Sequence, residues 1–323
     1  MPRVAVVIPS WNGRTLLAHC LEALTRQSEQ DFVVIVVDNG STDGTKEWLR
    51  HYHPSVQLIS NASNNGFARA ANEGIQASDA PYIAVLNNDT EPSTQWLAEL
   101  LAAAETDPRI GMVASKMLFA DRPDMINSAG ICVDLAGIAW DRLGGAMDDP
   151  GEMKRSGIFG PCGGAALYRR RMLDEIGLFD ESFFAYLEDV DLAWRGLAAG
   201  WRCLYAPEAR VLHRHSATAV EGSPFKRYQL GRNKVWLLAK NYPFRALWWG
   251  GPVAVLYDVA AVLYALLARR DLHALRGRIA GLLTVAPYLG QRPRYKSRPD
   301  IALMSPLVPP WRVPARYAHL EKR

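Results

Sequence analysis

The chain has 323 residues, of which 49% are hydrophobic and 22% are charged, as in globular proteins with a substantial core. This length predicts about two domains, or one large α/β domain with an appendage. The net charge of +4 divides unevenly: residues 1–222 hold 19 Lys and Arg against 29 Asp and Glu, whereas residues 223–323 hold 18 against 4. A body at −10 followed by a tail at +14 predicts an anionic partner for the tail, either nucleic acid or a membrane surface.

The four cysteines indicate a reduced compartment. They lie far apart and form no CxxC pair, so neither a zinc motif nor a dithiol redox motif is expected, and four is a low count for a secreted scaffold. No signal peptide is expected, because the apolar run at residues 4–8 is short and ends at Pro9. We therefore expect a cytosolic protein.

Apolar runs alternate with helical patterns along the first part of the chain. Each run is short and continuous, which is typical of strands that are buried on both faces of a parallel sheet. The alternation predicts βαβ units and an α/β fold with a doubly wound, mostly parallel sheet. We expect strands at residues 4–8, 32–37, 56–59 and 82–86, and helices at residues 16–24 and 67–76.

Polar residues follow three of these strands directly. They are Ser10 and Asn12, then Asp38 and Asn39, then residues 87–91. Ligands of such sheets bind beyond the carboxyl ends of the strands, so the pattern predicts a nucleotide-type site. No GxGxxG or GK[ST] loop is present, which argues against a Rossmann dehydrogenase and a P-loop NTPase. A divalent cation held by a carboxylate is then the expected means of neutralising phosphate charge.

The pattern changes after residue 111. Strands are expected at residues 112–119 and 131–140, followed by a turn-rich segment at 141–155 and a run of small residues at 160–168. A helix is expected from Arg169 to about Gly177, and short strands at residues 201–205 and 210–212. His213 and His215 follow the last strand and alternate along it, so they should face opposite ways and not share a metal.

Three carboxylates, Glu188, Asp189 and Asp191, fall within four residues at the predicted start of a helix that runs to Gly200. An ionised carboxylate beside a sheltered aromatic loop suits a general base. The alternative is a set of first-turn acids that stabilise the helix dipole, with Asp191 paired to Arg195 one turn along. The stretch alone leaves both interpretations open.

The basic tail contains no acid from residue 223 to residue 257. An apolar run at residues 246–268 is long enough to span a bilayer, but Asp258 lies within it and Gly250-Gly251-Pro252 interrupts it. A second, amphipathic stretch follows at residues 272–289. We expect interfacial helices on an anionic membrane surface, and keep a spanning helix, a packed cap and a homodimer interface as alternatives. No nucleic-acid-binding module is visible, so nucleic acid is not the expected partner.

Seven motifs, each weak alone, occur in order over residues 3–216, and together they resemble the inverting family 2 glycosyltransferases with the GT-A fold. The similarity is strongest to bacterial rhamnosyltransferases and galactofuranosyl-transferring relatives. The motifs are VVIPSWNG (6–13), VVDNGSTDGT (36–45), NNGFARAANEGI (64–75), LNNDTEP (86–92), GPCGGAALYRR (160–170), GLFDESFFAYLEDVDLAWRGLAAGW (177–201) and VLHRHS (211–216).

The resemblance implies roles for residues of this chain. Asp38 would accept a hydrogen bond from the pyrimidine N3–H, and Asp89 and His213 would bind a divalent cation, Mg²⁺ or Mn²⁺. Asn87 stands where the family has a further acid, which weakens the expected metal site. The other residues expected to bind the nucleotide-sugar are Pro9, Ser10, Asn12, Asn39, Gly66, Arg69, Asn72 and Asn88.

The resemblance also implies the chemistry. Asp189 would be the catalytic base, with Glu188 supporting it or positioning the acceptor, because inverting transfer needs one carboxylate to take a proton from the acceptor hydroxyl. The residues expected on the acceptor side are Gly163, Gly164, Phe184, Tyr186 and Trp194.

The expected organisation is a catalytic domain at residues 1–222, with a nucleotide half (1–110) and an acceptor and metal half (111–222). A basic, helical, membrane-apposed extension would follow at residues 223–323. The expected function is transfer of a sugar, foremost rhamnose from dTDP-rhamnose, to a lipid-linked cell-surface glycan at the inner face of the cell membrane. The alternatives are a sugar-phosphate nucleotidyltransferase, whose triphosphate loop is missing, and a non-catalytic scaffold.

Overall fold

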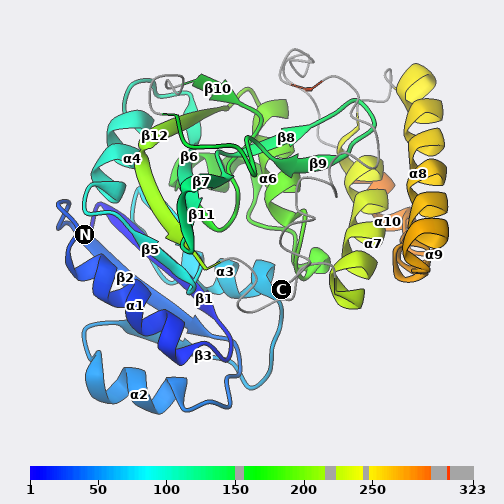
Figure 1. Cartoon of the computed structure of the whole chain (residues 1–323). Helices are drawn as coiled ribbons and strands as arrows, with labels where there is room; N and C mark the ends of the chain where they lie inside the picture. The colour runs from blue at the N-terminus through cyan, green and yellow to red at the C-terminus, as the bar shows by residue number, and fades with distance from the viewer. Residues whose placement is uncertain (150–155, 215–222, 243–246, 292–303, 306–323) are drawn as a thin grey trace.

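The computed structural model describes residues 1–149, 156–214, 223–242, 247–291 and 304–305 (Figure 1). The strands are β1 (Val4–Ser10), β2 (Phe32–Asp38), β3 (Gln57–Ser60), β4 (Tyr82–Leu86), β5 (Thr90–Pro92), β6 (Ile110–Phe119), β7 (Arg122–Ser128), β8 (Ile131–Val133), β9 (Ala139–Asp141), β10 (Ser156–Ile158), β11 (Ala165–Arg169) and β12 (Arg202–His213). The helices are α1 (Arg14–Thr25), α2 (Thr45–Tyr52), α3 (Phe67–Gln76), α4 (Trp96–Ala104), α5 (Arg170–Ile176), the short 3₁₀ helix η1 (Glu181–Phe183), α6 (Glu188–Ala198), α7 (Pro224–Asn241), α8 (Leu247–Arg269), α9 (His273–Leu283) and α10 (Ala286–Leu289).

Within the described residues ten strands form one sheet, in the order β10-β12-β6-β11-β4-β1-β2-β3, with β5 on β12 and β7 on β6. The expected α/β sheet is confirmed, but the expectation that it is mostly parallel is wrong. Four of the nine strand pairings are parallel and five are antiparallel. Strands β1 to β4 are joined through helices and lie parallel, whereas β6 and β7 are joined by a short turn, which permits only an antiparallel pair.

Strand β1 lies in the middle of the core and is buried on both faces. Val4, Val6 and Ile8 pack with α1 and α4, while Ala5 and Val7 pack with α3 on the other face. This alternation is the two-residue period of a strand, and a strand covered on both sides is a continuous apolar run. The predicted buried strand is therefore confirmed, and its polar end at Ser10 is held at the sheet's edge.

The strand expected at residues 131–140 is instead a hairpin of β8 and β9. The side chain of Asp134 accepts hydrogen bonds from the backbone N–H groups of Ala136 and Ile138, both at 2.9 Å. Gly137 has a φ of 70°, which favours glycine. An aspartate that bonds the backbone two and four residues on, followed by this glycine, forms a turn, and the turn divides the apolar run.

The two short strands expected at residues 201–205 and 210–212 are one continuous strand, β12. Its pairing with β6 shifts register between Ala206 and Arg210. The shift contains Pro207, which cannot donate to a strand ladder and is tolerated at a bulge. Strand β12 thus carries on past the proline and brings His213 to the edge where β5 begins.

Helices α7, α8 and α9 lie side by side at one end of the molecule (Figure 1). Helices α7 and α9 approach so closely that a Cβ on Gly231 would lie 2.5 Å from the Ala274 carbonyl oxygen, and one on Gly277 would lie 2.1 Å from that of Tyr228. On its other side α7 contributes Trp236 and Leu237 to the same apolar core as α3 and α6. Helix α7 is therefore packed on the core beside α3 and α6 as well as on its helical neighbours.

Asp258, the acid inside the apolar run, is neutralised within the protein. Its Oδ1 lies 2.9 Å from Lys234 Nζ on α7 and 2.8 Å from Arg278 on α9. Of the described residues, α8 is the one helix long and apolar enough to cross a membrane, with a mean hydropathy of 1.8 over Gly251–Ala268. One such helix is weak evidence for a membrane span, and the ion pairs give Asp258 a structural role.

Candidate active site

The carboxyl ends of β1, β2 and β4 meet at one edge of the sheet. Ser10 ends β1 and is the register partner of Asp38, which ends β2. Asn88, just beyond β4, donates a hydrogen bond from Nδ2 to Ser10 Oγ at 3.0 Å. Pro9 precedes Ser10 and pairs with Val37. Four of the residues expected to bind the nucleotide-sugar are thus gathered at this edge.

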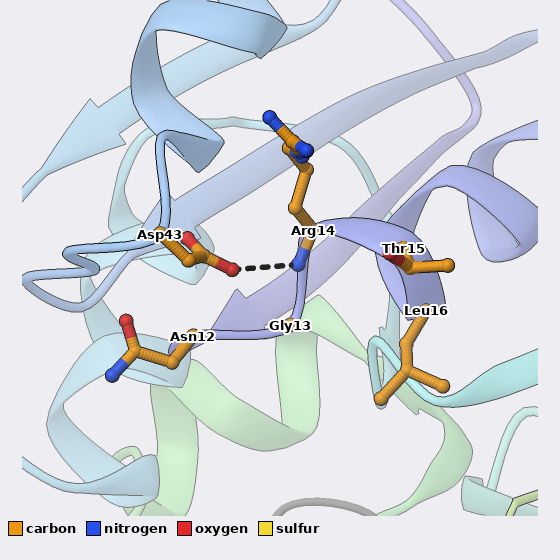
Figure 2. A pocket seen from close by; sticks show the side chains of 6 residues that line it. All are labelled: Asn12, Gly13, Arg14, Thr15, Leu16 and Asp43. Carbon is orange, nitrogen blue, oxygen red and sulfur yellow. Dashed lines mark hydrogen bonds between the residues drawn. The ribbon is translucent and has the colours of Figure 1, made fainter.

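The loop after β1 is tied to the loop after β2 by hydrogen bonds from backbone N–H groups to side-chain oxygens. Asn12 Oδ1 accepts from the Thr42 N–H at 2.8 Å, and the Arg14 N–H donates to Asp43 Oδ2 at 3.0 Å, as Figure 2 shows for the second bond. These bonds join the start of α1 to the loop after β2. A pocket of about 280 Å³ lies there and does not include Asp189; its lining residues are Asn12, Gly13, Arg14, Thr15, Leu16 and Asp43.

Asn39 braces the donor-side loops. Its Nδ2 donates to Asn64 Oδ1 at 2.9 Å and to the Gly66 carbonyl at 3.1 Å. Its Oδ1 accepts from Asn61 Nδ2 at 3.2 Å and from the Asn65 N–H at 3.1 Å. With every hydrogen-bonding group engaged in this way, Asn39 shapes the site by fixing the segment before α3.

Gly66 is the point where the donor-side segment touches the aromatic loop of residues 178–187. A Cβ at Gly66 would lie 2.5 Å from the Phe184 carbonyl oxygen, and its φ of 87° is one that L-residues rarely adopt. The same carbonyl accepts a hydrogen bond from the Ala68 N–H at 3.3 Å. Residues expected on the donor side and on the acceptor side are therefore in direct contact.

Two of the residues expected to face the donor are used differently. Asn72 is 4% exposed, and its side-chain amide bonds both the backbone N–H and the carbonyl of Phe179 at 3.0 and 2.9 Å. Arg69 is largely exposed and forms an ion pair with Glu73 at 3.1 Å. In this geometry Asn72 anchors the start of the aromatic loop, and Arg69 remains on the surface of α3.

Asp89 and His213, the two expected metal ligands, lie together. Asp89 Oδ1 is 3.2 Å from His213 Nε2, and His213 Nδ1 is 2.8 Å from Asn127 Oδ1. Asn127, on β7, is a further residue of this site that the sequence did not indicate. His215 lies outside the described residues, so its expected orientation is not tested.

The two ligands fit a divalent cation. Since Asn127 Oδ1 is an acceptor, it selects the tautomer with hydrogen on His213 Nδ1, which turns the Nε2 lone pair toward Asp89. Asp89 Oδ1 is buried and accepts no hydrogen bond from the described residues. Ligand atoms about 2.1 Å from one cation would themselves lie about 3 Å apart, which is close to the observed spacing. No group of three or more His, Cys, Asp or Glu side chains suited to a metal occurs among the described residues.

Asp189 lies in the first turn of α6, against the chain segment of small residues before β11. Its Oδ2 accepts from the Gly163 N–H at 2.9 Å, and its Oδ1 accepts from the Val190 N–H at 2.8 Å. Burial raises the pKa of Asp189 to about 6, despite these two hydrogen bonds, which favour the ionised form. The next residue, Gly164, is also closely packed, because a Cβ added there would lie 3.2 Å from Asn87 Nδ2. Gly163 thus positions the predicted base directly.

Glu188 is a buried acid with an unsatisfied oxygen. It is 6% exposed, and its Oε2 has no hydrogen-bond partner among the described residues. Burial, and then the neighbouring charge of Asp189, raise the pKa of Glu188 to about 8. The two adjacent acids titrate as a pair, and Asp189 ionises before Glu188, because Asp189 accepts two backbone hydrogen bonds and Glu188 Oε2 accepts none.

Asp191 has the structural role that its spacing from Arg195 predicted. It is fully buried, and its Oδ2 lies 2.8 Å from Arg195 Nε and 3.1 Å from Lys240 Nζ. Its Oδ1 accepts from Asn241 Nδ2 at 2.7 Å. Although burial alone would raise it, the Arg195 and Lys240 charges keep the pKa of Asp191 below its usual value. The contact with α7 was not predicted.

The aromatic loop enters α6 through a strained backbone. Phe184, Tyr186 and Leu187 have φ values of 64°, 71° and 69°. Left-handed conformations of this kind cost about 1–3 kcal/mol for each residue that is not glycine, and they persist only where the surroundings impose them. The expected acceptor-side residues Phe184 and Tyr186 lie in this strained segment, directly before Glu188 and Asp189 in the chain.

Trp194, which was expected on the acceptor side, is a core residue. It is 2% exposed and its ring packs edge-on against Phe159 and Tyr242, with ring centroids 5.5 and 6.1 Å apart. Position 194 lies one turn beyond Val190 on the buried side of α6. Its tryptophan therefore anchors the helix and has no free surface for an acceptor.

The chain matches known glycosyltransferases in sequence and in fold. The family model "Glycosyl transferase family 2" matches residues 5–177. An N-acetylglucosaminyl-diphospho-decaprenol L-rhamnosyltransferase of Mycobacterium tuberculosis is 28% identical over 300 residues, which cover 84% of this chain and 95% of that protein. The O-antigen biosynthesis protein RfbC of Myxococcus xanthus is 27% identical over 75% of this chain but only 20% of its own length.

Two solved structures share the fold. A mannosyltransferase, PcManGT of Pyrobaculum calidifontis, in complex with GDP-Man and Mn²⁺, superposes with a TM-score of 0.53 over 90% of this chain and 85% of that one, at 20% identity. GalNAc-T7 with UDP, GalNAc and Mn²⁺ gives a TM-score of 0.61 over 87% of this chain and 55% of that one, at 16% identity. With its GT-A-like sheet and a family model covering more than half of its length, the chain belongs to glycosyl transferase family 2.

Proposed function

We propose that this glycosyltransferase moves rhamnose from dTDP-rhamnose, with inversion, to a hydroxyl of a lipid-linked cell-surface glycan. The observation that carries the mechanism is the carboxylate of Asp189, a half-buried residue, which is held by the Gly163 N–H close to the donor-side segment that begins at Gly66. The similarity to the mycobacterial protein, whose name specifies rhamnose transfer to N-acetylglucosaminyl-diphospho-decaprenol, supports the donor and the lipid-linked acceptor.

In the proposed reaction Asp189 takes the proton from the acceptor hydroxyl as its oxygen attacks the anomeric carbon. The new C–O bond forms on the face opposite the nucleoside diphosphate, whose C–O bond breaks, so the anomeric configuration inverts. The Gly163 N–H orients the carboxylate, and the ionised state of Asp189 above about pH 6 leaves it ready to accept a proton. Protonated Glu188 adds no second negative charge beside it.

Asp89 and His213 would hold a divalent cation, which supplies positive charge to the departing diphosphate. The sequence has no glycine cradle for phosphate, so the cation would take over the role of such a loop. Asp38, 2% exposed at the end of β2, would accept a hydrogen bond from the N3–H of uracil or thymine. The buried position lets a single hydrogen bond discriminate the base, because an unpaired partner there is costly.

Asp189→Asn tests the base directly. The amide keeps the shape of the side chain but cannot accept the proton, so kcat should fall by about 10²–10⁴-fold, the usual contribution of general base catalysis. The dissociation constant for the nucleoside diphosphate should stay within a factor of about two, because Asp189 does not contact the donor-side edge. Initial rates and equilibrium binding measure the two effects. An unchanged kcat would remove Asp189 from the mechanism.

Glu188→Gln tests the ionisation of the pair. Because the pKa of Glu188 is raised on folding to about 8, the folded protein binds a proton that the unfolded chain releases above about pH 4.5. Wild-type stability should therefore fall progressively between about pH 4.5 and pH 8 and then level off, whereas the neutral glutamine avoids this loss. The free energy of unfolding of the variant minus that of the wild type should be more than about 1 kcal/mol larger at pH 9 than at pH 4, as measured by urea unfolding. A difference that does not change with pH would contradict the assignment.

A thermal-shift panel tests the donor and the cation together. dTDP-rhamnose should raise the melting temperature more than UDP-galactose or GDP-mannose, and the increase should require Mn²⁺ or Mg²⁺, since a ligand stabilises the state that binds it. Asp89→Asn should abolish the cation-dependent part. Glu91→Gln is the matched control, because Glu91 lies two residues away and pairs with Arg214 on the surface. Equal shifts without any cation would exclude the metal site.

We propose that α8 and α9 rest on an anionic membrane surface at the inner face of the cell membrane. Leu256, Val259, Leu263 and Leu267 follow at spacings of three and four, so they share one face of α8, and they are 48–79% exposed. The opposite side carries Asp258, which is bound to α7 and α9. A helix with one side tied to the protein and an apolar side outward suits an interfacial position better than a spanning one.

Leu256→Glu with Leu267→Glu tests this surface while leaving α7 in place. Sedimentation of the full chain with vesicles containing phosphatidylglycerol should fall at least tenfold, because two charges replace exposed apolar side chains. Tyr52→Glu, on the exposed side of α2 at 66% exposure, is the control and should sediment as the wild type does. If the wild type does not bind vesicles but forms a dimer that the double variant breaks, the surface is a homodimer interface.

A further inference from the structure

The strained loop that leads into α6 is held by a residue of α7. Asn233 is fully buried, and its Nδ2 donates to the carbonyl oxygens of Phe183 at 3.0 Å, Ala185 at 3.0 Å and Tyr186 at 2.7 Å. An amide carries two N–H groups, so the three carbonyls share two hydrogens. A single side chain thus bonds three of the four residues from 183 to 186, from a position 47 to 50 residues further along the chain.

The orientation of the Asn233 amide follows from its neighbour. Arg232 Nε donates to Asn233 Oδ1 at 3.0 Å, which requires the oxygen on that side and the nitrogen toward the loop. The Arg232 guanidinium also lies 4.3 Å from the Trp236 ring centroid and donates to the Phe183 carbonyl at 3.2 Å. The donor group that meets the loop is therefore fixed by packing on α7.

Helix α7 also contacts the aromatic loop through Phe225, and it contacts α6 through Lys240 and Asn241. The Phe225 ring lies 6.0 Å from that of Phe184 and 6.4 Å from that of Tyr186, centroid to centroid. Lys240 and Asn241, seven and eight residues after Asn233 and so on the same side of α7, bind Asp191. Helix α7 thus spans the junction between the loop and the helix that carries Asp189.

We propose that Asn233 is a positioning residue for transfer, which keeps residues 183–187 in the strained conformation that sets Asp189 and the acceptor-side residues Phe184 and Tyr186. The proposal rests on the proposed role of Asp189 as the base. Three residues with positive φ relax when the donors that hold their carbonyls are removed, and relaxation there displaces the first turn of α6. The basic, acid-free α7 is then part of the catalytic unit.

Asn233→Ala and Asn233→Asp in the full chain test the clamp. Alanine removes the donors, and aspartate keeps the shape but turns an oxygen toward the carbonyls. Both variants should lower kcat at least tenfold and leave the dissociation constant of the nucleoside diphosphate within about twofold. Amide hydrogen exchange over residues 181–192 should rise at least tenfold in both. If aspartate behaves as wild type, shape alone matters and the donor role is refuted.

Lys234→Met is the matched control, because Lys234 is the next residue of α7, is 8% exposed and binds Asp258 away from the loop. It should lower the melting temperature while kcat and exchange at residues 181–192 stay within twofold of wild type. If Lys234→Met changes kcat and exchange as much as the Asn233 variants do, Asn233 stabilises the fold and does not position the loop. Hydrogen exchange is measured without substrate, so it reports whether Asn233 holds the loop whatever the catalytic base is. If Asp189→Asn leaves the transfer rate unchanged, the proposed base is refuted, and the exchange result still tests the role of Asn233.

Discussion

The ion-pair network around Asp191 is the interaction on which α6, the helix that carries the proposed base Asp189, depends. A fully buried carboxylate in the first turn of α6 is neutralised by Arg195 of the same helix and by Lys240 of α7. Breaking such a pair by removing one partner costs about 3–5 kcal/mol, because a charge is left buried. Three acids in one turn thereby have different environments: Asp191 is paired, Asp189 accepts backbone hydrogen bonds, and Glu188 is buried without a charged partner. Different environments separate their pKa values, which is how neighbouring carboxylates take different roles.

This network changes what the charge of the tail means. The net charge of +14 after residue 222 predicts an anionic partner for the tail, but acids of the body of the protein supply part of that partner. Lys240 binds Asp180 and Asp191, which lie in the acidic body. Lys234 and Arg278 bind Asp258, an acid of the tail that the net +14 already includes. These cations are used inside the fold, so attraction to a membrane depends on the remaining basic residues and on the apolar face of α8. Truncating the chain before α7 would therefore remove a structural partner of α6 along with any membrane contact.

Local patterns account for the first half of the sheet and for the Asp191–Arg195 pair. Continuous apolar runs at β1 and β4 and an i,i+4 charge pair need no knowledge of the rest of the chain. The bulge of β12 at Pro207 and the antiparallel strands needed tertiary pairing to be seen. The turn at Asp134 has a local signal, an aspartate followed three residues later by Gly137, within an otherwise apolar run. Asn127 and Asn233 had no local signal, because their partners lie 86 and about 50 residues away. From the sequence Asp258 appears only as a charge that opposes membrane insertion, because its partners Lys234 on α7 and Arg278 on α9 lie more than one helix turn away in the chain.

The backbone that leads into α6 shows why the sequence motif alone does not determine the geometry of the site. Phe184, Tyr186 and Leu187 would each favour an ordinary backbone, and no local preference predicts three positive φ values in four residues. The conformation exists because Gly66 leaves room for the Phe184 carbonyl and Asn233 binds the carbonyls on the other side. The motif supplies the carboxylate, and the segments before and after it in the chain supply its position. A base on a backbone fixed from two sides loses little orientational freedom when an acceptor arrives, which is the advantage that positioning gives to catalysis.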